Sequence, residues 1–457
     1  MSQPENTGNR SGLSRPAPVG FREAVAFWLK LGFISFGGPA GQIAIMHQEL
    51  VEKRRWLSDQ RFLHALNYCM LLPGPEAQQL ATYIGWLMHR SWGGIVAGSL
   101  FVLPSLFMLI GLGWIYMAFA QLPAIAAILY GIKPAVTAIV IFAAYRIGSR
   151  ALKNRVLWSM AAAAFLSIFL LNLPFPLIVL SAAAIGAIGG KLAPQLFAAG
   201  GGHGAAQKHY GPALIDDDTP TPQHALFNWR KFAVVLALGL ALWAAAMIWL
   251  GSRYGWDGVL LEMAWFFSKA ALLTFGGAYA VLPYVYQGVV EHFHWLTAQQ
   301  MIDGLALGET TPGPLIMVVT FVGFVAGWTQ AVFGAGQLWL AGAVSALVVT
   351  YFTFLPSFLF ILAGGPLVES THGNLKYTAP LTGITAAVVG VILNLAVFFA
   401  WHVFWPQGFN GRFDGFSALI SVLAFLALFR YRVGIIPVIL VCGGAGLLVD
   451  WLKFWLS

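Results

Sequence analysis

The stretch that decides the fold consists of Phe36-Gly37-Gly38, then Trp56-Leu57, then Pro73-Gly74-Pro75, because this set occurs twice. Each block of the second copy lies 239 positions later, at Phe275-Gly276-Gly277, Trp295-Leu296 and Pro312-Gly313-Pro314. Between Glu23 and Pro75, 16 of 53 positions are identical to the residue 239 positions later. So many identities without an insertion or deletion indicate an internal duplication.

The composition is that of a membrane protein. Of the 457 residues, 59% are hydrophobic and 9% are charged, and the mean hydropathy is +0.77. About 20 apolar helical residues cross a hydrocarbon core of about 30 Å. The apolar runs are long and continuous, whereas a strand barrel needs short alternating segments. We therefore predict an all-α polytopic membrane protein.

Five parts follow along the chain. Residues 1–20 lack the apolar core of a signal peptide and are predicted to be a disordered cytoplasmic tail. Residues 21–192 and 252–457 are predicted to be the two membrane repeats, with 193–251 between them. The polar segment 193–228 is predicted to be a flexible cytoplasmic linker, and 229–251 a connector transmembrane helix.

Loop charges predict that the two repeats insert in opposite orientations. The loop 52–61 holds four Lys or Arg residues, whereas its counterpart 291–300 holds none. Farther along the repeats the charge asymmetry reverses: Arg430 and Arg432 lie in the second repeat, and the equivalent stretch of the first, 169–171, lacks Lys and Arg. Because Lys and Arg collect on the cytoplasmic side, we predict inverted-topology repeats with the N-terminus cytoplasmic and the C-terminus periplasmic. These loops account for the net charge of +8, so no nucleic-acid partner is expected.

The Gly-Gly and Pro-Gly-Pro blocks predict broken helices. Interior Pro removes a helix hydrogen bond, and Gly permits a sharp reversal. If the flanking loops are all cytoplasmic, 24–50 and 62–88 are re-entrant pairs of half-helices. The alternative is that each is one long kinked crossing. In either case the N-terminus of a half-helix, with free N–H groups and a partial positive charge, suits an oxyanion.

Charged residues near these blocks are candidates for substrate binding and coupling. Lys30 and Lys269 occupy the same repeat position, six residues before each Phe-Gly-Gly, where a Lys near the bilayer centre costs about 2.5–3.5 kcal/mol. Each could instead extend its amine to the membrane interface. Glu76 follows the first Pro-Gly-Pro and Glu309 precedes the second, so both are candidates for proton coupling, or only for capping freed backbone groups.

Several functions find no support in the sequence. The phosphate-binding pattern GxxxxGK[ST] is absent, so ATP is not expected as the direct energy source. No nucleophile and base occur at a catalytic spacing, so no enzyme is predicted. Cys69 and Cys442 lie in apolar runs, and neither a metal site nor a cofactor is expected.

Several strings around the repeated blocks resemble those of a known family. The strings FGGPAGQIAIMHQELVEKRRWL and LLPGPEAQQLATYIGW in the first half, with FGGAYAVLPYV and TPGPLIMVVTFVGF in the second, are similar to the two-domain members of the chromate ion transporter family. The resemblance implies efflux of chromate across the inner membrane of a prokaryote, by secondary active transport on the membrane potential or proton gradient. It adds Gln42 and Gln79 as signature positions.

The combined substrate-binding candidates are Lys30, Gly37, Gly38, Gln42, Gly74, Pro75, Gln79, Lys269, Gly276, Gly277, Thr311, Gly313 and Pro314. The second copy has Ala278, Ala280 and Val281 where the first has Pro39, Gly41 and Gln42, so the two half-sites are expected to bind unequally. The expected partners are chromate or a similar tetrahedral oxyanion, protons and the lipid bilayer. A sulfate or other oxyanion carrier and a passive anion channel remain open alternatives. So does the oligomeric state, a homodimer included.

Overall fold

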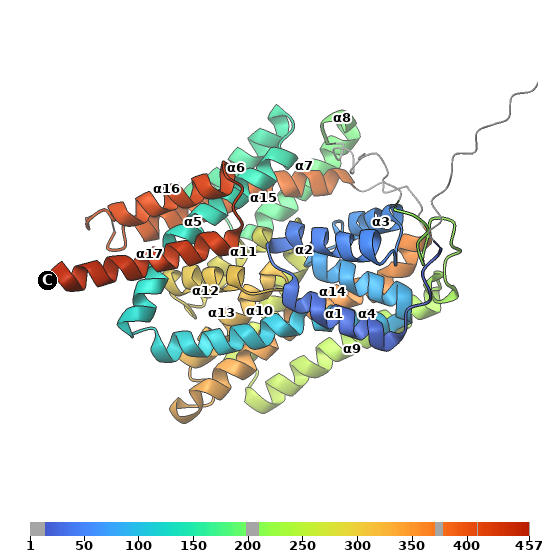
Figure 1. Cartoon of the computed structure of the whole chain (residues 1–457), viewed down its shortest axis with the longest axis horizontal. Coiled ribbons are helices and arrows are strands. Elements are labelled where there is room, and N and C mark those ends of the chain that lie inside the picture. The colour runs from blue at the N-terminus through green and yellow to red at the C-terminus, as the bar shows by residue number, and fades with distance from the viewer. Residues whose placement is uncertain (1–13, 198–209, 371–377, 409, 457) are drawn as a thin grey trace, which may run out of the picture.

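The computed structural model describes residues 14–197, 210–370, 378–408 and 410–456, and within these ranges every regular element is a helix (Figure 1). Seven of the described helices are long and apolar enough to cross a membrane, namely α4, α5, α7, α9, α14, α15 and α17. The all-α membrane fold predicted from composition is therefore confirmed.

The first repeat is built from seven principal helices and a π-helical turn. In chain order these are α1 (Phe21–Ile34), α2 (Gly38–His47), η1 (Gln48–Lys53), α3 (Asp59–Cys69), α4 (Glu76–Phe119), α5 (Pro123–Ala151), α6 (Arg155–Leu171) and α7 (Phe175–Leu192). The short α8 (Pro194–Phe197) and η2 (Gln223–Ala225) follow, and α9 (Trp229–Tyr254) connects to the second repeat.

The second repeat contains the same series. Its elements are α10 (Val259–Leu273), α11 (Ala278–Tyr286), η3 (Gln287–His292), α12 (Ala298–Thr310), η4 (Leu315–Met317), α13 (Val318–Thr329), η5 (Ala335–Gln337), α14 (Leu338–Ser370), α15 (Thr378–Phe404), α16 (Gly415–Phe429) and α17 (Ile435–Leu456). Even the uncommon π-helical turn recurs, because η1 and η3 occupy equivalent positions.

The segments around Phe-Gly-Gly run out and back. The Phe27 ring, in the middle of α1, lies 4.9 Å from the ring of Trp56, which follows η1. The equivalent pair, Phe266 and Trp295, lies 6.1 Å apart. The beginning of each segment therefore meets its end, as a helical hairpin requires, while the path of these hairpins through the bilayer stays a prediction.

The centre of the molecule is a pair of equivalent helices that run antiparallel. The chain leaves helical geometry at His89 and Arg90, so α4 is two helices, and its second part, 91–119, packs on α14. A Cβ placed on Gly94 would lie 3.3 Å from Leu362, and one on Gly98 would lie 2.5 Å from Phe358. The contact partner moves from 362 to 358 as the position in α4 moves from 94 to 98, so the two helices run antiparallel. Equivalent helices that pack in this way are related by a two-fold axis, as expected of inverted repeats.

The last helices of each repeat pack on the other repeat. Helix α5 packs against α16 and α17, and α15 packs against α6 and α7, so the red C-terminal helices lie beside the teal α5 in Figure 1. Glycines permit this approach: a Cβ on Gly131 would lie 2.8 Å from the N atom of Gly446, and one on Gly383 would lie 3.0 Å from Cα of Gly186. Small residues at helix contacts are typical of membrane bundles. The repeats are therefore interlocked rather than set side by side.

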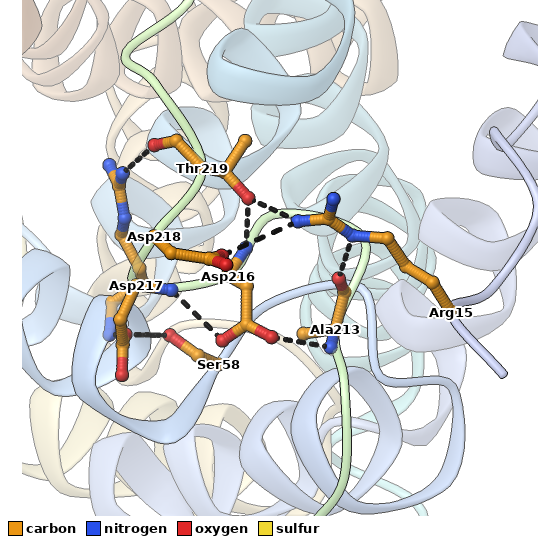
Figure 2. Close-up of polar contacts among 8 residues, drawn as sticks. Arg15, Ser58, Ala213, Asp216, Asp217, Asp218 and Thr219 are labelled. Carbon is orange, nitrogen blue, oxygen red and sulfur yellow. Dashed lines mark hydrogen bonds and ion pairs between the residues drawn. The ribbon is translucent and has the colours of Figure 1, made fainter. Parts of the chain in front are cut away.

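The predicted linker differs from a freely exposed chain where it is described. Residues 198–209 lie outside the described residues, but the backbone N–H groups of Leu214 and Ile215 donate to the carbonyls of Arg55 and Trp56, at 2.8 and 3.0 Å. Arg15 of the predicted tail donates to the Ala213 carbonyl at 2.8 Å and pairs with Asp218 at 3.7 Å (Figure 2). A polar composition predicts a flexible segment, yet side chains and backbone of the described part bond to the basic 55–61 loop.

Candidate substrate site at the helix breaks

All four predicted breaks coincide with helix ends. Helix α1 ends at Ile34 and α2 begins at Gly38, while α3 ends at Cys69 and α4 begins at Glu76. In the second repeat the corresponding gaps lie between α10 and α11 and between α12 and η4. At Gly74 φ is +129° and at Gly313 it is +91°, values that L-residues rarely adopt, so glycine is required at the centre of each Pro-Gly-Pro.

The breaks of one repeat bond to the breaks of the other. The N–H of Gly74 donates to the carbonyl of Thr274 at 2.7 Å, and the N–H of Gly313 donates to the carbonyl of Ser35 at 2.8 Å. Ser35 and Thr274 are equivalent positions, each just before a Phe-Gly-Gly. Each Pro-Gly-Pro is therefore paired with the Phe-Gly-Gly break of the opposite repeat, and the two crossed pairs form the centre of the candidate site.

Two equivalent serines of the central helix pair face these crossings. A Cβ on Gly74 would overlap the Ser357 hydroxyl of α14, and a Cβ on Gly313 would overlap the Ser105 hydroxyl of α4. The Ser105 hydroxyl donates to the Pro312 carbonyl, whereas the Ser357 hydroxyl is buried and has no hydrogen-bond partner among the described residues. The two half-sites therefore differ in which serine remains available.

Two glutamines of the first repeat explain the difference. Gln79 Nε2 donates to the Pro73 carbonyl at 2.8 Å, the role that Ser105 fills at Pro312. Gln42 Nε2 donates to the carbonyl of Gly313 and, at 3.4 Å, to that of Ser35. The second repeat has valine at both equivalent positions. The predicted inequality of the half-sites thus has a structural counterpart in which Gln79 leaves the Ser357 hydroxyl free.

The centre offers an anion several donors. The hydroxyls of Ser35 and Ser357 are buried and have no partner among the described residues. The first N–H groups of α4 and of the η4–α13 helix have no acceptor within their helices and carry a partial positive charge. Hydroxyls and helix N-termini together recognise charge and tetrahedral shape, and no catalytic chemistry is needed.

The candidate coupling residues lie close to the breaks in different settings. Glu309, at the end of α12, is buried and accepts a hydrogen bond from the Tyr279 hydroxyl of α11. Thr311 is buried as well, but its hydroxyl donates to the Gly308 carbonyl at 2.9 Å and so satisfies its own helix end. Glu76 is the first residue of α4 and is partly buried. Pro75 and Pro314 immediately precede their helices as N-cap residues.

The structure does not bring the paired lysines into this centre. Lys30 and Lys269 are both exposed on their helices. The Lys269 amine lies 5.6 Å from the ring centroid of Trp265, a half-exposed side chain. A lysine beside a tryptophan on the outer face is typical of the membrane interface, the second of the two interpretations of this pair.

Polar clusters tie the repeats together at opposite ends of the central helix pair. At the end of α14, buried Glu369 pairs with Arg61 of α3 at 2.7 Å and accepts a hydrogen bond from Tyr83. At the far end of α4, Tyr116 donates to buried Asp303 of α12 at 3.0 Å, and Lys133 lies 3.6 Å from the same carboxylate. Both clusters join the helix before a Pro-Gly-Pro to the long helix of the other repeat.

Sequence reasoning missed the serines and the crossed pairing. Ser105 and Ser357 stand at equivalent places, each after a proline, and this repetition was the available signal. Their position opposite Gly313 and Gly74 depends on how the repeats fold together, which the repeat offset alone does not contain.

Fold and site together define a multi-pass helical membrane protein whose two interlocked repeats meet at paired helix breaks. The family model described as chromate transporter matches residues 22–187 and 261–447, one match in each repeat. The chain belongs to the chromate transporter family.

Individual relatives agree with the family match. The chain is 34% identical to the chromate transport protein of Pseudomonas aeruginosa, over 95% of this chain and 94% of that one. It is 30% identical to the chromate transport protein of Cupriavidus metallidurans, over 87% of each. It is 28% identical to a probable chromate transport protein of Synechococcus elongatus, over 82% and 84%. No solved structure matches the chain.

Proposed function

We propose that this protein is a secondary active transporter that exports chromate from the cytoplasm, driven by the proton gradient or the membrane potential. Two relatives that match over 94% and 87% of their length are named for chromate transport, which supports the substrate. The observation that carries the proposal is the pair of crossed hydrogen bonds between breaks of opposite repeats, Gly74 to Thr274 and Gly313 to Ser35. A site made jointly by two inverted repeats can be exposed alternately to either side of the membrane.

The anion is proposed to bind at the Gly74 half-site. There the Ser357 hydroxyl is free because Gln79 already holds the Pro73 carbonyl. The N-terminus of α4 adds free N–H groups and a partial positive charge. At the Gly313 half-site Ser105 is already engaged with the Pro312 carbonyl, so that half is proposed to support the fold of the break.

Coupling is proposed to involve the carboxyl groups beside the breaks. Glu309 lies buried two residues before Thr311, and Glu76 stands at the N-terminus of α4 where a bound dianion would repel its charged form. Protonation of Glu76 would relieve that repulsion, so anion binding and proton binding would favour each other.

The direct test is chromate uptake into everted membrane vesicles, with and without an imposed proton gradient and with excess sulfate. Wild type should accumulate chromate only in energised vesicles, and Ser357→Ala should lower that uptake. Chromate uptake that is the same with and without the proton gradient would instead indicate a passive anion channel. Movement of sulfate without chromate would indicate a carrier for a different oxyanion.

A second pair of variants separates the two candidate binding groups. Lys269→Met should retain most uptake if the crossed breaks bind the anion, because its amine lies beside Trp265. Complete loss in Lys269→Met with normal uptake in Ser357→Ala would contradict the proposed half-site.

A further inference from the structure

An apolar groove lies between α9 and the two central helices, beside the contact of α9 with α14. Its walls include Ile95 and Leu106 of α4, Leu238 and Leu242 of α9, and Phe354 and Leu359 of α14, and its volume is about 580 Å³. Leu238 and Leu242 are each more than half exposed, so this connector helix covers the groove only in part. The volume is within the range of ordinary ligand sites.

The groove adjoins a second hollow that contains basic side chains. This hollow, of about 320 Å³, shares Ser91, Val235 and Leu362 with the groove, and it is also lined by Arg230 and Lys231 at the start of α9. His224, Asn228 and Phe227 complete the same wall. An apolar channel and a basic mouth are therefore continuous.

The cations at this mouth have no counter-ion. Arg90, Arg230 and Lys231 are exposed, and none of them forms an ion pair with another described residue. His224 lines both this hollow and the adjoining one that contains Arg90, so the positive charges of both act on its ring. Burial lowers the pKa of His224, and repulsion from Arg90 and Lys231 lowers it further. Arg230 and Lys231 thus line a hollow that has no protein carboxylate among its described lining residues, and Arg90 lines the hollow beside it.

We propose that this groove binds an anionic phospholipid, with an acyl chain along the apolar channel and the phosphate at Arg230 and Lys231. A zwitterionic lipid would bring its own ammonium group beside these cations and leave their net charge uncompensated, and a free anion would leave the apolar channel empty. Basic pockets between transmembrane helices are where anionic headgroups bind. The inference does not depend on the transported substrate.

The site has a mechanical consequence. The groove wall is made by α4 and α14, the helices that also carry Ser105 and Ser357. A lipid bound here contacts the supports of both crossed breaks, so its headgroup is expected to influence the rate of transport as well as stability.

Lipid binding can be measured by native mass spectrometry of the full chain in detergent, titrated with phosphatidylglycerol or with phosphatidylethanolamine of the same acyl chains. Wild type should prefer phosphatidylglycerol. The double variant Arg230→Gln/Lys231→Gln should bind it roughly 30-fold more weakly, since each lost charge beside an anionic lipid is worth about fivefold. Its affinity for phosphatidylethanolamine, whose ammonium group offsets the phosphate charge, should fall much less, so the preference for phosphatidylglycerol should be lost.

The matched control is Arg150→Gln/Lys153→Gln, which removes two exposed charges away from the groove and should bind lipid as wild type does. Leu238→Trp, which fills the channel from an exposed position, should weaken binding of both lipids. Equal phosphatidylglycerol binding by the Arg230/Lys231 variant would overturn the proposal. So would full competition by glycerol phosphate, which lacks acyl chains, or loss of a dimer in Leu238→Trp with unchanged lipid binding.

Discussion

Removal of the two equivalent serine hydroxyls should have opposite consequences. The Ser357 hydroxyl is buried and bonded to no described group, so Ser357→Ala removes nothing that stabilises the fold. The Ser105 hydroxyl donates to the Pro312 carbonyl, so Ser105→Ala leaves a buried acceptor unsatisfied.

The magnitudes follow from these contacts. A hydrogen bond to a charged group contributes about 1.5–3 kcal/mol, so Ser357→Ala should weaken chromate binding roughly 10- to 150-fold. Its thermal unfolding should match that of the wild type. Ser105→Ala should lose about 1–3 kcal/mol of stability, the cost of an unpaired buried polar group, with a smaller change in affinity.

The assay is equilibrium dialysis of radiolabelled chromate against the purified protein, together with thermal unfolding of the same samples. Ser345→Ala is the matched control, because Ser345 is also a buried serine of α14 with an unpartnered hydroxyl but lies beside Gly327 rather than a Pro-Gly-Pro. It should change neither quantity. If Ser357→Ala binds chromate as tightly as the wild type, or is destabilised as much as Ser105→Ala, the assignment of the half-sites is wrong.

Three further predictions concern the break, the end cluster and the 210–228 segment. Gly74→Ala should lower vesicle uptake far more than Gly277→Ala. Both glycines have positive φ, but a Cβ on Gly74 would lie 2.6 Å from Gln79 Nε2, whereas a Cβ on Gly277 would have no atom within 4 Å. Glu369→Gln should destabilise the protein by about 3 kcal/mol because the mostly buried Arg61 side chain loses its counter-ion, whereas Lys53→Gln, at a pair whose Lys is exposed, should cost under about 0.5 kcal/mol, as thermal unfolding would report. Burial lowers the folded-state pKa of His224 below its ordinary 6.5, so the stability that the neutral ring allows is present above pH 6.5 and is lost as the pH falls below it. After correction for the intrinsic pH dependence of amide exchange, the protection of 210–228 should be lower at pH 5.5 than at pH 7.5, and His224→Asn should remove that difference.

The repeats could be predicted because their signals are local. Proline and glycine interrupt a helix wherever they stand, so the ends of α1, α3, α10 and α12 were visible in the sequence. Continuous apolar runs likewise identified the long helices.

The interlocked arrangement could not be predicted in this way. Membrane helices are apolar on every side, so α5 carries no polar face that would exclude its own α6 and α7 and select α16 and α17. The crossed pairing of Gly74 with Thr274 depends on that arrangement. The lysine pair shows a related limit: repetition shows that Lys30 and Lys269 share a position, but not which way their side chains point.

The central claim is that chromate binds where the breaks of opposite repeats cross. Anomalous diffraction at the chromium edge, from crystals of the full chain grown with chromate, locates the anion directly. The account predicts a chromium peak next to the Ser357 hydroxyl and the N-terminus of α4. A peak beside Lys30 or Lys269, with none at the Gly74 crossing, would contradict it.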